Sequence, residues 1–273
     1  MLIDTHCHIN LMVKKEFDTL LTPKNLEAAK TVVLEAEQEG VEKIINVGTS
    51  LIESKNCILL AQENANTYAT IGIHPSDCAP SWNKELKKIM EYIKNKKESK
   101  IIAIGECGID LYHQKHNVQQ QKDLFKAQIE LSLEHDLPLT IHMRDATDEV
   151  ASCLEAFKNE QLKGVIHCFS EDQPFANHIF ELGLSIGIGG AITYPNNEAL
   201  RNVVLKSPLS NIILETDAPF LAPQIIRGKP NHPKYINDIA KYIANLKQVS
   251  FDYIAEQTTN NALKLFEMPE TND

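Results

Sequence analysis

The stretch Ile3-Asp4-Thr5-His6-Cys7-His8 is predicted to form a short strand that ends in two histidines separated by one residue. Side chains two apart on a strand point to the same side, roughly 6–7 Å from each other. His6 and His8 are therefore able to hold one metal ion, while Cys7 points the opposite way. An H-x-H pair alone is a weak signal, because it also occurs by chance. Its weight depends on whether ligand-type residues recur at the same place after later strands.

The composition is that of an ordinary globular protein, and its charge argues against a broad electrostatic grip on nucleic acid. The chain has 273 residues, of which 43% are hydrophobic and 23% charged, and a formal net charge of −10. Nucleic-acid-binding domains are usually basic, so only a local basic patch around an active site is compatible with this balance. Acidic composition is common among cytoplasmic enzymes.

The sequence shows no sign of export or membrane insertion. No apolar run approaches the roughly 18 residues of a membrane span, and the N-terminus starts directly on a strand rather than on a signal peptide. The six cysteines form no C-x-x-C pair. We therefore expect a cytoplasmic protein with free thiols, no membrane association and no obligate protein partner.

Strand-like and helix-like segments alternate along the whole chain. The expected strands cover residues 2–6, 43–48, 67–75, 101–104, 137–142, 164–169, 184–187 and 211–217. Helical patterns separate them, and two helices are expected to close the chain at 233–246 and 251–266.

Eight strand–helix units predict a parallel sheet with right-handed crossovers. We expect this sheet to close into a single (β/α)8 TIM barrel that takes up residues 1–273, since a barrel of about 250 residues uses nearly all of this length. A dinucleotide-binding open sheet is the alternative. It lacks its signature here, because no G-x-G-x-x-G follows the first strand.

Ligand-type residues fall at the carboxyl ends of the expected strands, which share one mouth in a barrel. They are His6 and His8 at the end of the first strand, Glu106 just after the fourth, His142 ending the fifth, His167 ending the sixth and Asp217 after the eighth. A lone histidine at a strand end more often packs or hydrogen-bonds than binds a metal. Six such residues at one end are much harder to obtain by chance, and four histidines with two carboxylates suit Zn, Mn or related ions.

Longer motifs carry a resemblance to a known family. They are Asp4-Thr5-His6-Cys7-His8, Ile71-Gly72-Ile73-His74-Pro75, Gly105-Glu106-Cys107-Gly108-Ile109-Asp110, Ile141-His142-Met143-Arg144, His167-Cys168-Phe169-Ser170, Glu215-Thr216-Asp217-Ala218-Pro219, Arg227-Gly228-Lys229-Pro230-Asn231-His232-Pro233 and Asn261-Ala262-Leu263-Lys264-Leu265-Phe266. With these motifs the chain resembles the TatD family of metal-dependent deoxyribonucleases, among the amidohydrolase-like barrel enzymes. The resemblance covers essentially the whole chain in order.

The resemblance implies two metal positions that share one carboxylate. One position would be held by His6, His8, Glu106 and Asp217, and the other by Glu106, His142 and His167. Many relatives in the wider superfamily bridge their metals with a modified lysine at the end of the fourth strand, where this chain carries Glu106. Nitrogen-rich ligation fits Zn or Mn, whereas Mg prefers more oxygen.

Two divalent ions about 3.5–4 Å apart suit phosphodiester hydrolysis. Besides the bridging Glu106, Asp217 is the candidate catalytic residue, since one oxygen can bind a metal while the other accepts a proton from water. His74, Arg144 and Lys229 are candidate substrate contacts, because a cationic fork or point charge can clamp phosphate oxygens. The alternatives are an ion pair of Arg144 with a neighbouring acid and a solvated loop position for Lys229.

Residues next to the ligands have more ordinary expected roles. Glu215 and Asp110 are expected either to orient ligand histidines or to cap loops. Strand alternation is expected to turn Cys7 and Cys168 away from the mouth. Glu171 stands where the TatD family usually has a glycine, which places an extra carboxylate after the sixth strand.

Four further histidines lie on or near expected helices, and we expect them to be solvated: His113, His116, His135 and His178.

Two functions from different classes remain open. The first is a deoxyribonuclease that cleaves DNA from an end or in single strands, because a barrel mouth admits a terminus more readily than a continuous duplex. The second is a small-molecule amidohydrolase, such as a deacylase, lactonase or deaminase. Fold and metals alone do not choose between them. The Arg-Lys-Asn loop favours phosphate and the acidic charge favours the small molecule, while a non-catalytic scaffold is disfavoured because every ligand position is filled.

Overall fold

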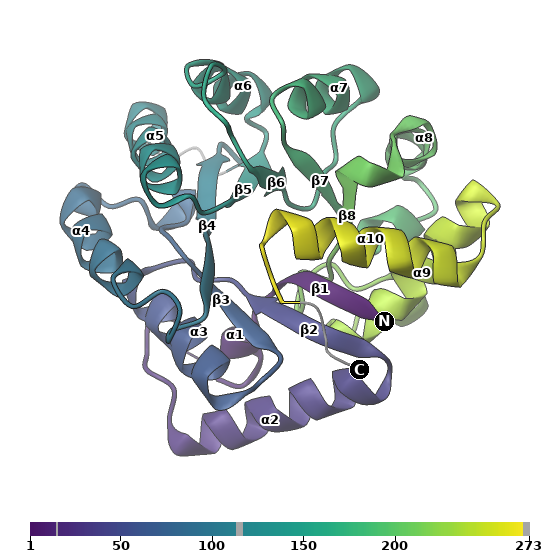
Figure 1. Cartoon of the computed structure of the whole chain (residues 1–273), viewed down its shortest axis with the longest axis horizontal. Coiled ribbons are helices and arrows are strands. Elements are labelled where there is room, and N and C mark those ends of the chain that lie inside the picture. Colours follow the sequence, from purple (N-terminus) through teal and green to yellow (C-terminus); the bar gives the residue numbers. More distant parts are fainter. Residues whose placement is uncertain (15, 113–116, 270–273) are drawn as a thin grey trace.

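Eight parallel strands form the centre of the molecule and are surrounded by helices (Figure 1). The structure is a computed structural model and describes residues 1–14, 16–112 and 117–269. Neighbouring strands pair in chain order from the first to the eighth. They are β1 (Leu2–Cys7), β2 (Val41–Asn46), β3 (Thr67–Ile71), β4 (Ile101–Asp110), β5 (Leu139–Arg144), β6 (Gly164–Ile166), β7 (Ser185–Ile188) and β8 (Ile212–Leu214).

The last strand returns to the first and closes the barrel. The hydroxyl of Thr5 donates to the carbonyl of Leu214 at 2.8 Å, and the amide of Asp217 donates to the carbonyl of His6 at 2.8 Å. The predicted (β/α)8 barrel is therefore confirmed. Because β8 itself is short, these bonds bring the segment after it alongside the end of β1.

The helices follow the strands in alternation, as the sequence pattern predicted. They are α1 (Ile9–Met12), α2 (Pro23–Gln38), α3 (Leu51–Glu63), α4 (Trp82–Ile93), α5 (Val118–His135), α6 (Thr147–Glu155), α7 (Gln173–Glu181), α8 (Glu198–Lys206), α9 (Ile236–Lys247) and α10 (Phe251–Leu265). Side chains of Thr22, Ser50, Asn117, Asp172 and Ser250 accept the first free amides of their helices. Among the described residues, no helix is long and apolar enough to cross a membrane.

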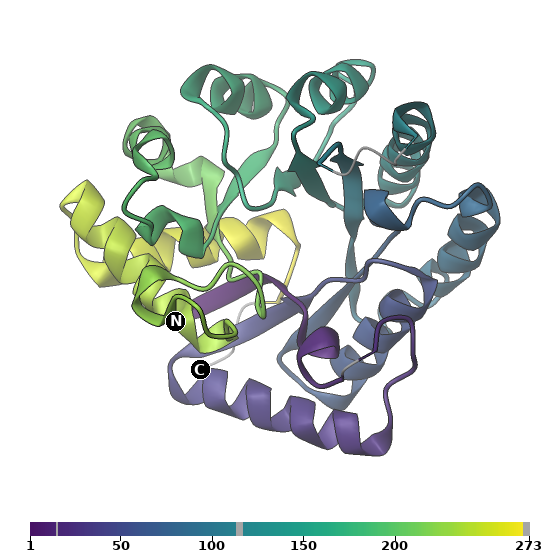
Figure 2. The ribbon, with the colours of Figure 1, turned by 180° about the vertical axis from the view of Figure 1, so that it is seen from behind.

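The amino-terminal end of the barrel is filled by side chains. Inward-facing Ile3, Ile45 and Val165 pack there with Phe266 and Met268, which follow α10. Figure 1 shows α10 crossing this end, and Figure 2 shows the opposite side, where the loops after the strands gather. These apolar side chains fill the barrel at its amino-terminal end, and the ligand-type residues lie at the opposite end.

The fourth strand is longer than predicted, which corrects the placement of Glu106. The sequence pattern ended this strand at Ile104, but β4 continues and pairs with β5, so Glu106 lies inside the strand. The register shifts between Ile104 and Cys107, and a bulge of this kind re-aims the side chains within it. Gly108 permits the close pairing, because a Cβ there would lie 1.9 Å from the carbonyl oxygen of His142. The longer pairing with β4 also extends β5 to Arg144, so His142 lies within β5 and not at its end.

Candidate metal centre

A cavity of about 390 Å³ opens at the carboxyl ends of the strands. Side chains from widely separated segments meet in it, namely His8, His74, Glu106, Asp110, His142, Arg144, His167 and Asp217. His6 lies beneath them and is fully buried. The structure therefore brings all six predicted ligand residues together at one end of the barrel.

The first donor group surrounds one oxygen of Glu106. The Nε2 atoms of His6 and His8 lie 3.1 Å from each other, and they lie 3.6 and 3.7 Å from Glu106 Oε2. Asp217 Oδ1 is 3.6 Å from the His6 nitrogen and 3.4 Å from the His8 nitrogen. Two nitrogens and two carboxylate oxygens therefore face one small space.

The second donor group surrounds the other oxygen of the same carboxylate. Glu106 Oε1 lies 2.9 Å from His142 Nδ1 and 2.9 Å from His167 Nε2. These two ring nitrogens are 3.1 Å from each other. Glu106 thus stands between the two groups and offers a different oxygen to each.

The donor spacing and the ring partners both fit divalent ions. Two nitrogens bound to one tetrahedral zinc, each about 2.0–2.1 Å from it, lie about 3.3 Å from each other. His8 holds the carbonyl of Val47 at 3.1 Å through Nδ1, and His142 holds Asp110 Oδ2 at 3.1 Å through Nε2. In the neutral form of each ring, a proton on those nitrogens makes these bonds and the opposite nitrogen carries the lone pair that a metal would bind. Asp110 thus lies where it was predicted to orient a ligand histidine.

The two carboxylates are ionised, which suits cation binding. Burial opposes the charge of His142, but Asp110 and Glu106 outweigh it and raise its pKa to about 9, so a metal would have to displace a proton from this ring. Burial opposes the negative charge of Glu106, but the neighbouring His167 and His74 and hydrogen bonds from His142 and His167 outweigh it and hold its pKa well below the usual range. Burial likewise opposes the charge of Asp217, whose pKa is nevertheless lowered by His8 and His6. Burial, followed by the charge of His167, lowers the pKa of His6 to about 4. At neutral pH, anionic oxygens therefore face a neutral His6 ring.

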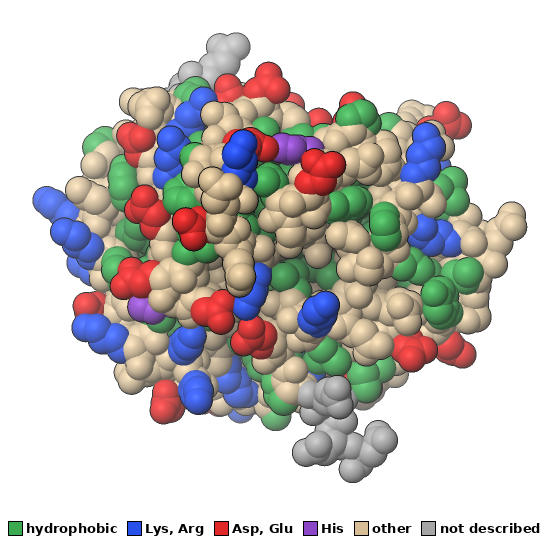
Figure 3. Space-filling view, turned by 45° about the horizontal axis from the view of Figure 1, so that its top comes forward, with side chains coloured by type: hydrophobic (Ala, Val, Ile, Leu, Met, Phe, Trp, Pro, Cys, Tyr) green, Lys and Arg blue, Asp and Glu red, His purple; other side chains and the backbone are tan. Residues whose placement is uncertain are grey.

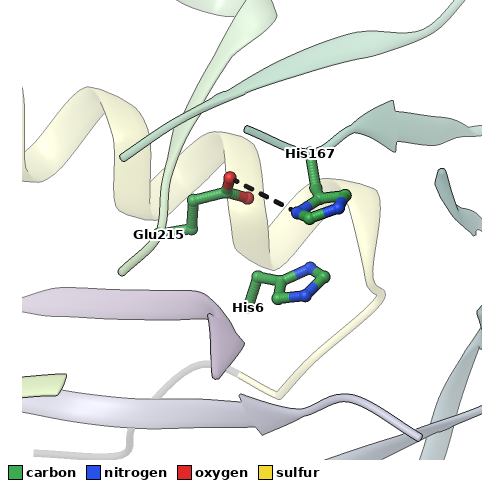
Figure 4. A group of neighbouring side chains, drawn as sticks. All are labelled: His6, His167 and Glu215. Carbon is green, nitrogen blue, oxygen red and sulfur yellow. Dashed lines mark ion pairs between the residues drawn. The ribbon is translucent and has the colours of Figure 1, made fainter. Parts of the chain in front are cut away.

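Glu215 lies beneath the donor groups and points at the ring of His167 (Figure 4). The rings of His6 and His167 are stacked with centroids 4.0 Å from each other, and Glu215 Oε1 lies 3.9 Å from His167 Nδ1. Burial raises the pKa of Glu215 to about 7. Gly187 leaves room for this carboxylate, because a Cβ there would lie 2.4 Å from Glu215 Oε2. Glu215 therefore lies beside a predicted ligand histidine, at a distance longer than a hydrogen bond.

Cys168 is a residue at this site that the strand pattern placed wrongly. The pattern continued the sixth strand to residue 169 and turned Cys168 outward, but β6 ends at Ile166. Cys168 has a positive φ of 46°, and its Sγ lies within 4.8 Å of donor atoms of His167 and Asp217. Strand alternation does not apply past the end of a strand, and the sequence offered no signal of the left-handed turn.

The predicted substrate contacts separate into two classes. His74 Nε2 lies 3.5 Å from Glu106 Oε1, and Arg144 lines the cavity with its guanidinium carbon 3.5 Å from the ring centroid of Tyr112. Among the described residues, no ion pair joins Arg144 to a neighbouring acid. Lys229 is exposed on the loop after β8 and is not one of the described residues that line the cavity.

Two further expectations concern the loops. Glu171 precedes the helix cap Asp172 and is not among the described lining residues, so its carboxylate is not part of the cavity wall. His113 and His116 lie outside the described residues.

The chain matches a known family over nearly its whole length. The family described as TatD related DNase matches residues 3–267. The chain belongs to this family. The prediction that rested on its motifs is confirmed, and the protein is a TatD-family metal-dependent hydrolase.

Individual TatD relatives cover the same span. YabD of Bacillus subtilis (strain 168), described as an uncharacterized metal-dependent hydrolase, is 35% identical over 97% of this chain and 99% of its own length. A protein of Pantoea ananatis named 3'-5' ssDNA/RNA exonuclease TatD is 32% identical over 86% of this chain and 92% of its own. The crystal structure of the TatD homologue YjjV from Escherichia coli K12 superposes with a TM-score of 0.88 at 30% identity, covering 98% of each chain.

Proposed function

We propose that this TatD-family hydrolase cleaves phosphodiester bonds of DNA from an end, with the help of two divalent ions. The observation that carries the proposal is the division of Glu106 between two donor groups, with Oε2 facing His6 and His8 and Oε1 facing His142 and His167. A carboxylate shared in this way suits a pair of ions close enough to act on one phosphate. The exonuclease name of the Pantoea ananatis relative supports the choice of substrate.

In this proposal each donor group holds one ion. His6, His8, Glu106 and Asp217 would hold the first, and Glu106, His142 and His167 the second. Zn, Mn or Mg bound there would lower the pKa of water and stabilise charge on the phosphate oxygens. Asp217 serves as the general base, because its carboxylate faces the cavity and its lowered pKa keeps it ionised and able to accept a proton.

Side chains inside the cavity, and not a broad basic surface, would contact the negative charge of the substrate. On the face shown in Figure 3, acidic and basic side chains are interspersed, in line with the net charge of −10. Inside the cavity, Arg144 offers a planar fork for non-bridging phosphate oxygens and is held flat against Tyr112. His74 lies beside Glu106 on the same side and contacts the phosphate from there.

A small-molecule deacylase or lactonase is the second candidate, and the size of the cavity favours it. A volume of about 390 Å³ falls within the usual range for small-ligand pockets. The negative net charge of the protein would also repel a neutral small molecule less than it repels DNA. The two candidates differ in whether a phosphodiester is the bond that is cleaved.

Degradation of end-labelled single-stranded DNA tests the proposal. Metal-stripped protein is supplied separately with Mg, Mn or Zn, and the products are resolved as a ladder. We expect metal-dependent shortening from one end, whose direction the ladder reveals. If no metal supports cleavage although both ions are shown to be bound, small-molecule amide or ester hydrolysis becomes the better assignment.

Lys229→Ala should raise the KM for oligonucleotides about two- to fivefold and leave the KM for a small neutral ester unchanged. The effect is expected to be modest because Lys229 is exposed and outside the cavity wall, where solvent screens its charge. Steady-state kinetics on both substrates measure it, and Lys229→Arg, which keeps the charge, is the matched control. Equal changes for both substrates would argue against a phosphate contact.

A further inference from the structure

Two large aromatic side chains stand exposed at the rim of the cavity. Phe17 is 68% exposed and Phe220 is 46% exposed, yet both line the cavity that contains the donor groups. They come from opposite ends of the chain, one from the loop after α1 and the other from the loop after β8. Exposed apolar side chains gathered at a functional cavity mark a contact surface for a ligand.

The loop that carries Phe17 is fastened to the barrel on both sides of the ring. Glu53 on α3 is buried and accepts the ammonium of Lys14 at 2.5 Å and the amide of Asp18 at 2.8 Å. The carboxylate of Asp18 accepts the hydroxyl of Ser50 at 2.5 Å. The hydrogen bonds of Lys14 and Asp18 therefore place Phe17 at the mouth of the cavity, where its ring is exposed.

Phe220 is fixed directly beside the first donor group. Its amide donates to the carbonyl of Asp217 at 2.7 Å, and the segment before it is held by the amide of Asn231, which donates to Pro219 at 2.9 Å. The Phe220 ring meets the ring of His8 edge-on, with centroids 6.0 Å from each other. Its position is thus coupled to a predicted metal ligand and to the candidate base.

The residues that line the cavity include aromatic, cationic and hydrogen-bonding side chains. Phe220 adjoins His8, whereas His74 stacks edge-on against His142 at 4.3 Å, and Arg144 lines the same cavity. The cavity therefore offers an aromatic ring beside His8, and cationic and hydrogen-bonding groups beside His142. A nucleotide has the same division, because a flat base is joined to an anionic phosphate.

We propose that Phe17 and Phe220 form a stacking site for the nucleobase of the terminal nucleotide of a single strand. The inference rests on the proposed phosphodiesterase function and specifies how that substrate is gripped. Stacking on aromatic side chains is worth roughly five- to hundredfold in affinity for each base. Every base has a π face, so the grip is tolerant of sequence, and it favours single strands because bases in a duplex are covered by their neighbours.

Oligonucleotides with and without a terminal base test this site. The same labelled single strand is prepared with an ordinary nucleotide or a tetrahydrofuran abasic residue at the end that the wild-type protein attacks. We expect wild type to prefer the base-bearing end roughly tenfold or more in kcat/KM. Phe17→Ala/Phe220→Ala should bring this ratio, taken within the variant, close to one, and Phe17→Tyr/Phe220→Tyr should restore the preference.

Leu20 and Ile225 supply the matched control, because they are exposed apolar side chains on the same two loops. They are 51% and 73% exposed, and neither is among the described residues that line the cavity. Leu20→Ala/Ile225→Ala should keep the wild-type preference. Fluorescence quenching of a terminal 2-aminopurine gives a second readout. The strand carries a slowly hydrolysed phosphorothioate at its terminal linkage, so that it stays intact during the measurement. We expect quenching by wild type and by the Leu20→Ala/Ile225→Ala control, and no quenching by the Phe17→Ala/Phe220→Ala variant.

The outcomes separate this inference from the function on which it rests. Equal cleavage of both ends by wild type, or a base preference that survives in the Phe17→Ala/Phe220→Ala variant, overturns the stacking site and leaves the nuclease in place. Failure of wild type to cleave either strand with both ions bound overturns the nuclease, and the stacking site with it.

Discussion

Asp217→Asn should lower the turnover of single-stranded DNA by about 10²- to 10⁴-fold, the usual contribution of a general base, while the protein stays folded. Asparagine keeps the size of the side chain but has no negative charge and does not accept the proton of water. The backbone contacts survive, because the amide of Asp217 donates to His6 and its carbonyl accepts from Phe220 without involving the carboxylate. We therefore expect loss of chemistry without loss of the barrel.

Turnover at saturating metal, metal content and thermal melting measure this effect together. Asp77→Asn is the matched control, because Asp77 lines the same cavity but belongs to neither donor group. Turnover of Asp217→Asn within twofold of wild type would remove Asp217 from the role of base. Loss of turnover together with loss of one ion would instead make it a ligand whose main task is to hold metal.

Glu106→Gln should have the larger effect, because Glu106 serves both donor groups. Glutamine has one oxygen and one NH₂ group, so only one of the two groups keeps an oxygen donor, and the shared negative charge is gone. We expect bound metal to fall from two ions per chain to one or fewer. The kcat/KM for DNA should fall by roughly 10³-fold or more, since each ion supplies several kcal/mol of transition-state stabilisation.

Metal content by mass spectrometry after dialysis is the decisive measurement. Glu106→Asp keeps the charge on a shorter side chain and should retain more metal than Glu106→Gln. The buried position of Glu106 among three histidines explains why charge matters here, since the rings of His142, His167 and His74 all approach Oε1. Two tightly bound ions in Glu106→Gln would show that this carboxylate is not the bridge.

The places where sequence reasoning was wrong share one physical cause. Glu106 was expected after a fourth strand that ended at Ile104, but pairing with β5 extends β4 through Glu106 to Asp110. Cys168 was predicted to point outward because side chains alternate along a strand, but β6 ends at Ile166, before Cys168. In both cases a partner distant in sequence decided the backbone, and a local pattern carries no information about that partner.

The amino-acid pattern was enough to predict the barrel and a set of candidate donor residues at its mouth. Alternating strand and helix patterns predict the barrel, and its connectivity places every strand's carboxyl end at one mouth, so His6 and Asp217 must meet there. The folded structure was needed to show which nitrogen of His8 and of His142 faces the donor groups and which oxygen of Glu106 faces each group. Those choices depend on contacts across the barrel, such as Val47 with His8 and Asp110 with His142, and on side-chain rotations that no spacing along the chain encodes.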